Sequence, residues 1–96
     1  MSAYVIAIIK VTNPEAYAEY ARLAAPVNAQ FDSKLLARSN LFEFLEGGLD
    51  CNRVVINRFD TIAQAKAFYH SVDYQAAKAK RTGAADFNML VVEGEN

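Results

Sequence analysis

The fold is decided by residues 53–81, which read RVVINRFDTIAQAKAFYHSVDYQAAKAKR. The opening residues, 53–59, are rich in valine and isoleucine and therefore predict a β-strand. Thr61 and Gln64 follow at the spacing of a capping box, in which the two side chains satisfy free backbone groups at a helix start. Ser71 then interrupts this helix and can cap a second, shorter one. The stretch predicts one strand followed by two consecutive helices.

A longer helix is predicted to begin at Asn13 and Pro14. Asn13 can accept hydrogen bonds from free backbone amides, and Pro14 suits the first helical position. Pro26 lacks a backbone donor, so we expect it to kink or end the helix, with residues 27–30 as a loose last turn. The apolar stripe of this helix consists of Ala16, Tyr17, Tyr20, Leu23, Ala24 and Val27.

The first and last strands are predicted at residues 3–11 and 87–93. In residues 3–11 both alternating sets of side chains are apolar, which is typical of a strand covered on both faces. The last strand is also apolar on both sets. These two strands are therefore expected to lie where another layer covers each side of the sheet.

A further strand is predicted at residues 34–46, joined by the turn-forming residues 46–50 to the strand at 53–59 as a hairpin. Ser39 and Asn40 are predicted to form a bulge or bend within it. One face of this strand consists of Leu36, Arg38, Asn40, Phe42 and Phe44. Arg38 is thereby placed among apolar side chains.

The element order β-α-β-β-α-β predicts one ferredoxin-like α+β domain over residues 1–96. Its four-stranded antiparallel sheet carries two helices on one face, because crossover connections are right-handed. The other face is apolar and needs a cover, and the same face of a second copy supplies one. We therefore expect a homodimer through the open sheet face, that is, a dimeric α+β barrel.

Composition restricts the function classes. The net charge of -1 argues against a nucleic-acid partner, which normally requires a basic face. The first apolar run is too short to span a bilayer and lacks the flanks of a signal peptide, so we expect no membrane association and a cytoplasmic location. The single cysteine, Cys51, suits a reducing compartment. No metal-ligand cluster and no Gly-rich phosphate loop is present in the sequence, so we expect neither a metal nor a cofactor.

The sequence resembles the small proteins of the domain-of-unknown-function family thirteen-thirty, within the dimeric α+β-barrel superfamily. The resemblance implies a ferredoxin-like protomer and a dimer whose two sheets form a barrel, and it implies no activity. It covers nearly the whole chain and rests on AYVIA (3–7), PEAYAEY (14–20), LAR (36–38), LEG (45–47), AKAFYHSVDYQ (65–75), Arg81 and VVEG (91–94).

The chain departs from this family at four places. The family often has glycine pairs where this chain has residues 32–33 and 39–40, and it tends to have proline at the position of Val72. It often has an acidic residue at the position of Arg58. Arginine there changes the charge near the sheet edge.

Four residues are predicted to contact a ligand in a cleft between helices and sheet: Arg38, Tyr20, Ser71 and Tyr74. An arginine on an apolar strand face needs a carboxylate, backbone carbonyls or a ligand anion, so an ion pair is the structural alternative for Arg38. The tyrosines are alternatively packing residues with one hydrogen bond each. Ser71 is most simply a helix cap, and Arg81 most simply complements a helix dipole. No catalytic residue is assigned, because His70 falls on the polar side of its helix and is expected at the surface.

Two functions are consistent with the sequence. The first is a small-molecule binder or enzyme, by analogy with cofactor-free monooxygenases and isomerases on the same barrel. It predicts a pocket lined by Arg38 and tyrosines. The second is a noncatalytic dimeric module without a ligand, which predicts that Arg38 is fully paired and that no sizeable cavity exists. An RNA-binding domain is disfavoured, because the third strand offers only Phe59 for base stacking.

Overall fold

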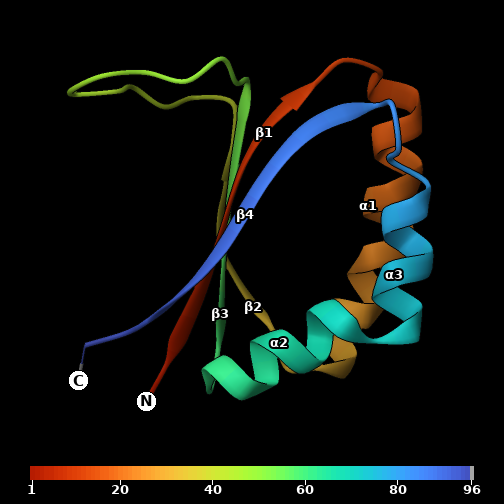
Figure 1. Ribbon diagram of the computed structural model, residues 1–96, viewed down its shortest axis with the longest axis vertical. Coiled ribbons are helices and arrows are strands. Elements are labelled where there is room, and N and C mark those ends of the chain that lie inside the picture. Colours follow the sequence, from red (N-terminus) through yellow and green to blue (C-terminus); the bar gives the residue numbers. More distant parts are fainter. Residues whose placement is uncertain (96) are drawn as a thin grey trace.

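The computed structural model describes residues 1–95 and contains one four-stranded antiparallel sheet with helices on one side (Figure 1). The strands are β1 (Ala3–Val11), β2 (Lys34–Ser39), β3 (Arg53–Phe59) and β4 (Ala85–Glu93). They are arranged in the order β2-β3-β1-β4, so the two longest strands, β1 and β4, are neighbours. This is the ferredoxin-like α+β arrangement that the element order predicted.

The helices are α1 (Pro14–Gln30), α2 (Ile62–His70) and α3 (Val72–Ala79). The three predicted caps are present. The Asn13 side chain accepts from the Ala16 amide, Thr61 Oγ1 accepts from the Gln64 amide at 3.0 Å, and Ser71 Oγ accepts from the Tyr74 amide at 3.1 Å. These caps satisfy amides that have no partner within the helix.

Pro26 was expected either to kink or to end helix α1, and the structure contradicts the second expectation. The helix continues through Pro26 to Gln30, so the proline does not end it. Pro26 is exposed, and so is Arg22, whose carbonyl loses its usual helical donor. Water can satisfy that carbonyl, which explains why the helix tolerates the proline there.

The second strand is shorter than predicted. β2 ends at Ser39, and residues 40–52, here called the arm, form no regular secondary structure and project from the sheet away from the helices (Figure 1). The prediction of a strand to residue 46 was therefore wrong. The reason is that β3 begins only at Arg53, so residues beyond Ser39, which pairs with Val54, have no partner strand.

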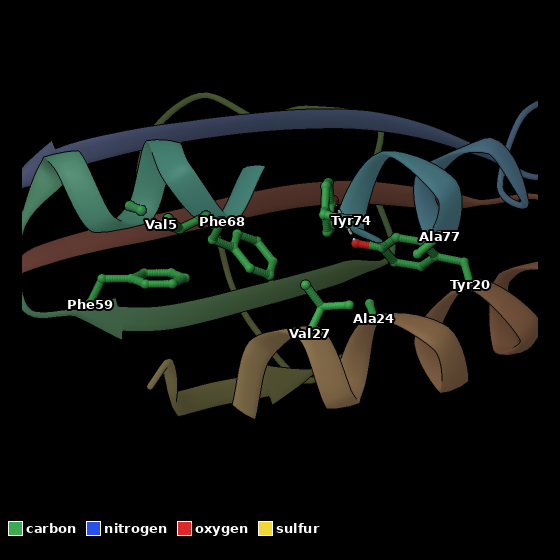
Figure 2. Packing of buried hydrophobic residues seen from close by; sticks show 9 residues of the cluster. Val5, Tyr20, Ala24, Val27, Phe59, Phe68, Tyr74 and Ala77 are labelled. Carbon is green, nitrogen blue, oxygen red and sulfur yellow. Dashed lines mark hydrogen bonds between the residues drawn. The ribbon is translucent and has the colours of Figure 1, made fainter. Parts of the chain in front are cut away.

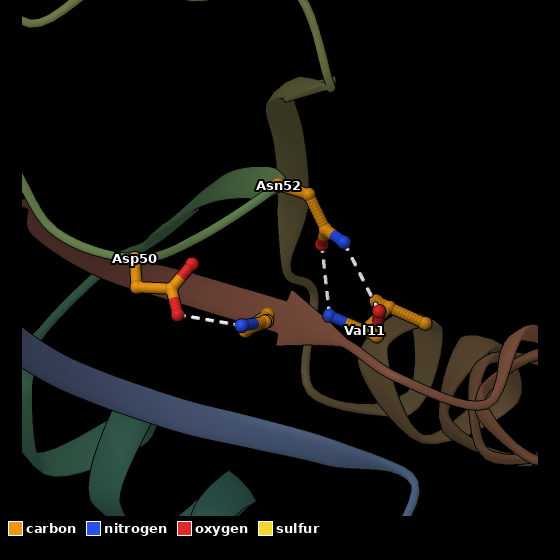
Figure 3. Close-up of polar contacts among 4 residues, drawn as sticks. Val11, Asp50 and Asn52 are labelled. Carbon is orange, nitrogen blue, oxygen red and sulfur yellow. Dashed lines mark hydrogen bonds and ion pairs between the residues drawn. The ribbon is translucent and has the colours of Figure 1, made fainter.

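The root of the arm is tied to the end of β1 (Figure 3). The Asn52 side chain accepts from the Val11 amide at 2.8 Å and donates to the Val11 carbonyl at 3.0 Å. Lys10 Nζ forms an ion pair with Asp50 at 2.5 Å. These contacts replace strand pairing at this end of the sheet.

The irregularity in β2 lies between Leu35 and Ala37, not at Ser39 and Asn40 as predicted. An extra residue in one strand reverses the alternation of the side chains that follow it. Arg38 consequently pairs with Val55 on the helix side of the sheet. The prediction that Arg38 shares a face with Leu36, Phe42 and Phe44 was wrong for this reason.

The core lies between α2, α3, α1 and the helix side of the sheet (Figure 2). Phe68 is central, with its ring centroid 4.6 Å from that of Tyr74 and 5.2 Å from that of Phe59. The cluster of buried residues consists of Val5, Tyr20, Ala24, Val27, Phe59, Ala65, Phe68, Tyr74 and Ala77.

The two faces of β1 are not equally covered within one protomer. Val5, Ala7 and Ile9 are buried against the helix layer, whereas the alternate residues are half-exposed on the opposite side of the sheet. That side, here called the open face, carries Tyr4, Ile6, Ile8, Ala37, Val54, Ile56, Leu90 and Val92. Within one protomer, β1 is therefore covered on one face only, whereas its sequence predicted cover on both faces.

Candidate ligand-binding site

Two adjacent cavities lie between the helix layer and the sheet. α2 packs on β1, β3 and β4, whereas α1 packs mainly on α3, so space remains between parts of the two layers. The cavity beside β4, here called the β4 chamber, has a volume of about 390 Å³, and the cavity beside β3, the β3 chamber, has a volume of about 150 Å³. The two chambers share the lining residues Val5, Phe68, Phe87 and Met89.

The β3 chamber brings together three of the residues predicted from sequence, Arg38, Tyr20 and Tyr74. The two tyrosine hydroxyls are 2.8 Å apart in a buried hydrogen bond. Burial, with Tyr74 as its nearest polar neighbour, raises the pKa of the Tyr20 hydroxyl well above its usual range. Tyr20 is therefore a neutral hydroxyl that can donate or accept at the wall of this chamber.

Arg38 enters the β3 chamber from the exposed edge strand β2. Within residues 1–95 it has no ion-pair partner and no hydrogen bond. The ion pair considered from the sequence is thus not formed inside one protomer. Arg38 is exposed, so its guanidinium donors remain available to an anion.

Ser71 does not line either chamber. Its hydroxyl donates to the Phe68 carbonyl at 2.8 Å and accepts from the Tyr74 amide at 3.1 Å. It therefore holds the junction between α2 and α3, as its alternative interpretation as a cap predicted. Its relation to the site is indirect, through the position of Tyr74.

Arg81 has a larger role in the geometry than its sequence suggested. Its guanidinium carbon lies 3.7 Å from the Phe87 ring centroid and 5.1 Å from that of Tyr20, and it lines the β4 chamber. Its Nε is buried without a hydrogen-bond partner. The sequence signal was the spacing of Tyr74, Lys78 and Arg81, which places all three on one side of a helix.

A second arginine is held in a similar way near α1. The guanidinium carbon of Arg53 lies 5.5 Å from the ring centroid of Tyr17, and its Nε is also buried without a partner. Burial raises the pKa of the Tyr17 hydroxyl, although Arg53 opposes that effect. The interlayer region thus contains arginines packed on aromatic rings, an arrangement that holds a guanidinium without a carboxylate.

The β4 chamber contains a tyrosine–lysine pair that the sequence did not reveal. Lys78 Nζ donates to the Tyr69 hydroxyl at 2.9 Å. This hydrogen bond, chiefly, lowers the pKa of Tyr69 from its usual value. His70 also lines this chamber, although its side chain is exposed as predicted.

The charged lining is of one sign. Neither chamber has an aspartate or glutamate among its lining residues. The remaining walls are aliphatic and aromatic. The titratable bases that line the chambers are Arg38, Lys66, His70, Lys78 and Arg81.

No cluster of three or more potential metal ligands occurs in the part of the chain that the structure describes. Among the helices of that same part, none has the length and apolar character needed to cross a membrane.

The fold and the chambers define a class, the ferredoxin-like α+β proteins with a cavity between helices and sheet. The chain belongs to the family described as "Domain of unknown function (DUF1330)", whose sequence profile matches residues 2–95. The family expected from the sequence is thereby confirmed. No curated protein matches the chain.

Solved structures show the same fold at low sequence identity. The RPA0582 protein of unknown function from Rhodopseudomonas palustris is 20% identical, with a TM-score of 0.74 over 99% of this chain and 83% of that one. A dimeric protein of unknown function and ferredoxin-like fold from Bacteroides fragilis is 11% identical, with a TM-score of 0.66 over 97% and 96% of the two chains. SnoaB, a cofactor-independent oxygenase from Streptomyces nogalater, is 12% identical, with a TM-score of 0.63 over 99% and 94%.

Proposed function

We propose that the protein is a homodimer that binds a small, largely apolar organic anion between its helices and its sheet. The observation that carries the proposal is the lining of the two chambers, which combines cations and tyrosines with aliphatic and aromatic walls and has no carboxylate. Such a lining favours a ligand with a planar apolar body and a carboxylate or an ionised hydroxyl group. Arg38, Tyr20 and Tyr74 are proposed to contact it in the β3 chamber, and Arg81 in the β4 chamber.

The alternative, a dimeric module without a ligand, made two predictions, and its partner for Arg38 was a carboxylate from the helices or from the other subunit. It required that Arg38 be fully paired and that no sizeable cavity exist. Arg38 has no protein partner within residues 1–95, and the β4 chamber has a volume of about 390 Å³, within the range of small-molecule sites. Both observations favour ligand binding.

The dimer is proposed from the open face and the arm. The open face is mainly aliphatic at its centre, with Arg58 and Asn88 beside it, and Leu90 remains 52% exposed. The arm projects on the side of the sheet away from the helices (Figure 1), and its residues Leu41 and Leu45 are 88% and 93% exposed. An apolar surface of this kind is typical of a protein interface, and two structural relatives, from Bacteroides fragilis and Thermobifida fusca, are described as dimeric. A cytoplasmic location is part of the proposal, since Cys51 is a free thiol.

Catalysis is not part of this proposal. SnoaB is described as a cofactor-independent oxygenase, but its 12% identity to this chain supports the fold and no more. The proposal concerns the chemical class of the ligand, which the chamber walls themselves support.

Ligand binding can be tested by thermal shift with a panel of aromatic carboxylates and phenols, each paired with its neutral ester or ether. We expect the anionic members to stabilise the wild type, by about 2.7 kcal/mol at about 100 times their Kd. Arg38→Ala and Arg81→Gln should reduce this stabilisation, because each removes a donor to the anion. Arg22→Ala is the matched control, since Arg22 is exposed on α1 and paired with Glu19.

The proposal fails if no anionic member stabilises the wild type. It also fails if Arg22→Ala reduces the shift as much as the two chamber variants do, because the effect would then reflect general surface charge.

A further inference from the structure

The tyrosine–lysine pair of the β4 chamber exists only because the helix is broken at Ser71. Tyr69 and Lys78 are nine residues apart. On one continuous α-helix this separation is about two and a half turns, which would place the two side chains on opposite sides. The Ser71 junction turns α3 back toward α2, and Gln75 Nε2 secures the turn by donating to the Tyr69 carbonyl at 2.7 Å. The junction at Ser71 thus brings Tyr69 and Lys78 into a contact that they could not make on one continuous helix.

Within the part of the chain that the structure describes, Lys78 takes part in no ion pair. The ion pairs found within residues 1–95 join Lys10 to Asp50 and Arg22 to Glu19, both outside the chambers. The hydrogen bond that the Lys78 ammonium makes is to the Tyr69 hydroxyl, which accepts it. An ammonium that donates to a phenol oxygen favours the ionised form of that phenol.

The other charged residues that line the β4 chamber are also basic. α2 contributes Lys66 and His70 to the lining, and Arg81 enters after the end of α3. β1 and β4 contribute only apolar side chains to the lining, and Asp73 of α3 and Asp86 and Glu93 of β4 are not among the lining residues. The pKa of Tyr69 is lowered chiefly by the Lys78 hydrogen bond, with smaller effects of the Lys78 and Arg81 charges and of Gln75, whereas burial raises the pKa of Tyr17 and Tyr20.

The surroundings distinguish this pair from an ordinary surface contact. The pair borders a cavity of about 390 Å³ whose opposite wall contains Phe87, Met89 and Val91. An aromatic ring placed against that wall has its edge substituents among the cationic groups. A hydroxyl on such a ring would therefore meet a proton acceptor and an oxyanion-stabilising group together.

We propose that Tyr69 and Lys78 form an acid–base pair that takes the proton from a phenol or enol hydroxyl of the ligand. The ligand O–H bond breaks, the proton binds to the Tyr69 phenolate oxygen, and the ligand retains the electron pair as its oxyanion beside Lys78 and Arg81. Tyr69 then releases the proton to solvent through its partly exposed side. No oxidant, reductant or second substrate is consumed. This inference rests on the proposed function, which places an organic anion in the chambers.

The acid–base property can first be measured without a ligand. Ultraviolet difference absorbance follows tyrosine ionisation in the wild type, Tyr69→Phe, Lys78→Met and Lys80→Met. We expect the first tyrosine to ionise in the wild type to be absent from Tyr69→Phe and to move to higher pH in Lys78→Met. Lys80→Met, which removes an exposed lysine at the end of α3, should leave the titration unchanged. If the first tyrosine ionisation in Tyr69→Phe has the same pH and amplitude as in the wild type, the proposal is overturned.

The second measurement uses 4-nitrophenol, whose phenolate absorbs at longer wavelength than its neutral form, and 4-nitroanisole, which lacks the hydroxyl. At a pH where free 4-nitrophenol is mostly protonated, we expect the bound compound to show about tenfold more phenolate relative to phenol, the size of one charge-assisted hydrogen bond. Tyr69→Phe and Lys78→Met should each remove most of this increase. Lys80→Met should not.

The outcomes separate the two proposals. If 4-nitrophenol and 4-nitroanisole both bind but the bound phenol keeps its ordinary acidity, the acid–base pair is overturned and ligand binding stands. If neither compound nor any aromatic carboxylate binds, the proposed function is overturned, and the pair's role in ligand ionisation is overturned with it.

Discussion

At the scale of single residues, the tyrosines between the helices and the sheet differ in how easily their hydroxyls ionise. Tyr20 and Tyr74 satisfy one another through a hydrogen bond of 2.8 Å in a buried environment, whereas Tyr69 is paired with a cation. The same side chain is therefore neutral in one chamber and inclined to ionise in the other. The surroundings of each tyrosine, rather than the residue type, therefore determine how easily its hydroxyl ionises.

Because Tyr20 is neutral in the folded protein, we expect the free energy of unfolding to decrease at alkaline pH. Because the folded-state pKa of Tyr20 is raised above the ordinary value of 10.0, the unfolded chain loses this proton first as pH rises. The contribution of Tyr20 is complete below pH ~10 and is lost progressively above it. We expect urea unfolding to show a free energy that falls above that pH, and a shallower fall in Tyr20→Phe.

Tyr4→Phe is the control for this pH dependence, since it removes a hydroxyl from the open face. An equally steep alkaline decline in Tyr20→Phe and in the wild type would contradict the assignment.

At the scale of elements, the junction at Ser71 decides how the second helical segment is used. A continuous helix from Ile62 to Ala79 would carry Tyr69 and Lys78 on opposite sides. Two capped helices instead place Tyr74 in the core and Lys78 beside Tyr69. The single hydroxyl of Ser71 contacts the end of one helix and the start of the next.

Ser71→Ala should destabilise the protein by about 1 kcal/mol, the usual effect of losing an N-cap side chain. Ser71→Asp retains an acceptor for the Tyr74 amide and should recover most of that loss. The measurement is the urea midpoint at constant m-value. Equal midpoints for Ser71→Ala and the wild type would show that the junction is held by other contacts.

At the scale of the whole molecule, one protomer leaves two apolar surfaces uncovered, the open face and the arm. Both lie on the side of the sheet opposite the helices (Figure 1). Ile6 is central on the open face, where it pairs with Ile56 and Leu90. A second sheet packed on this face would complete the barrel that the family resemblance implies.

Ile6→Lys should convert a dimer to a monomer in sedimentation at micromolar concentration, because it places a charge at the centre of the proposed interface. The matched control is Val72→Lys, which charges a side chain that is 84% exposed on the helix side. A wild-type monomer at this concentration, or a dimer that survives Ile6→Lys, would refute association through the open face.

Sequence by itself determined the features that depend on near neighbours. The caps at Asn13, Thr61 and Ser71 each involve a side chain and an amide three residues away, so their chemistry is readable locally. The alternation of apolar residues in β1 and the element order were sufficient for the ferredoxin-like fold. Arg38, Tyr20 and Tyr74 were predicted as ligand contacts from residue type and pattern; the fold brings them to one chamber, and their contact with a ligand stays a prediction.

Only the tertiary structure decided how distant segments meet. The bulge before Ala37 moves Arg38 to the other face of the sheet. The sequence around β2 does not determine at which residue the bulge occurs. β2 ends at Ser39 because its partner strand starts late, which is a property of pairing and not of residues 40–46. The Tyr69–Lys78 contact contradicts the periodicity of a single helix and arises from the angle at Ser71. Contacts of this kind depend on register and on helix direction, which are settled only when the whole chain packs.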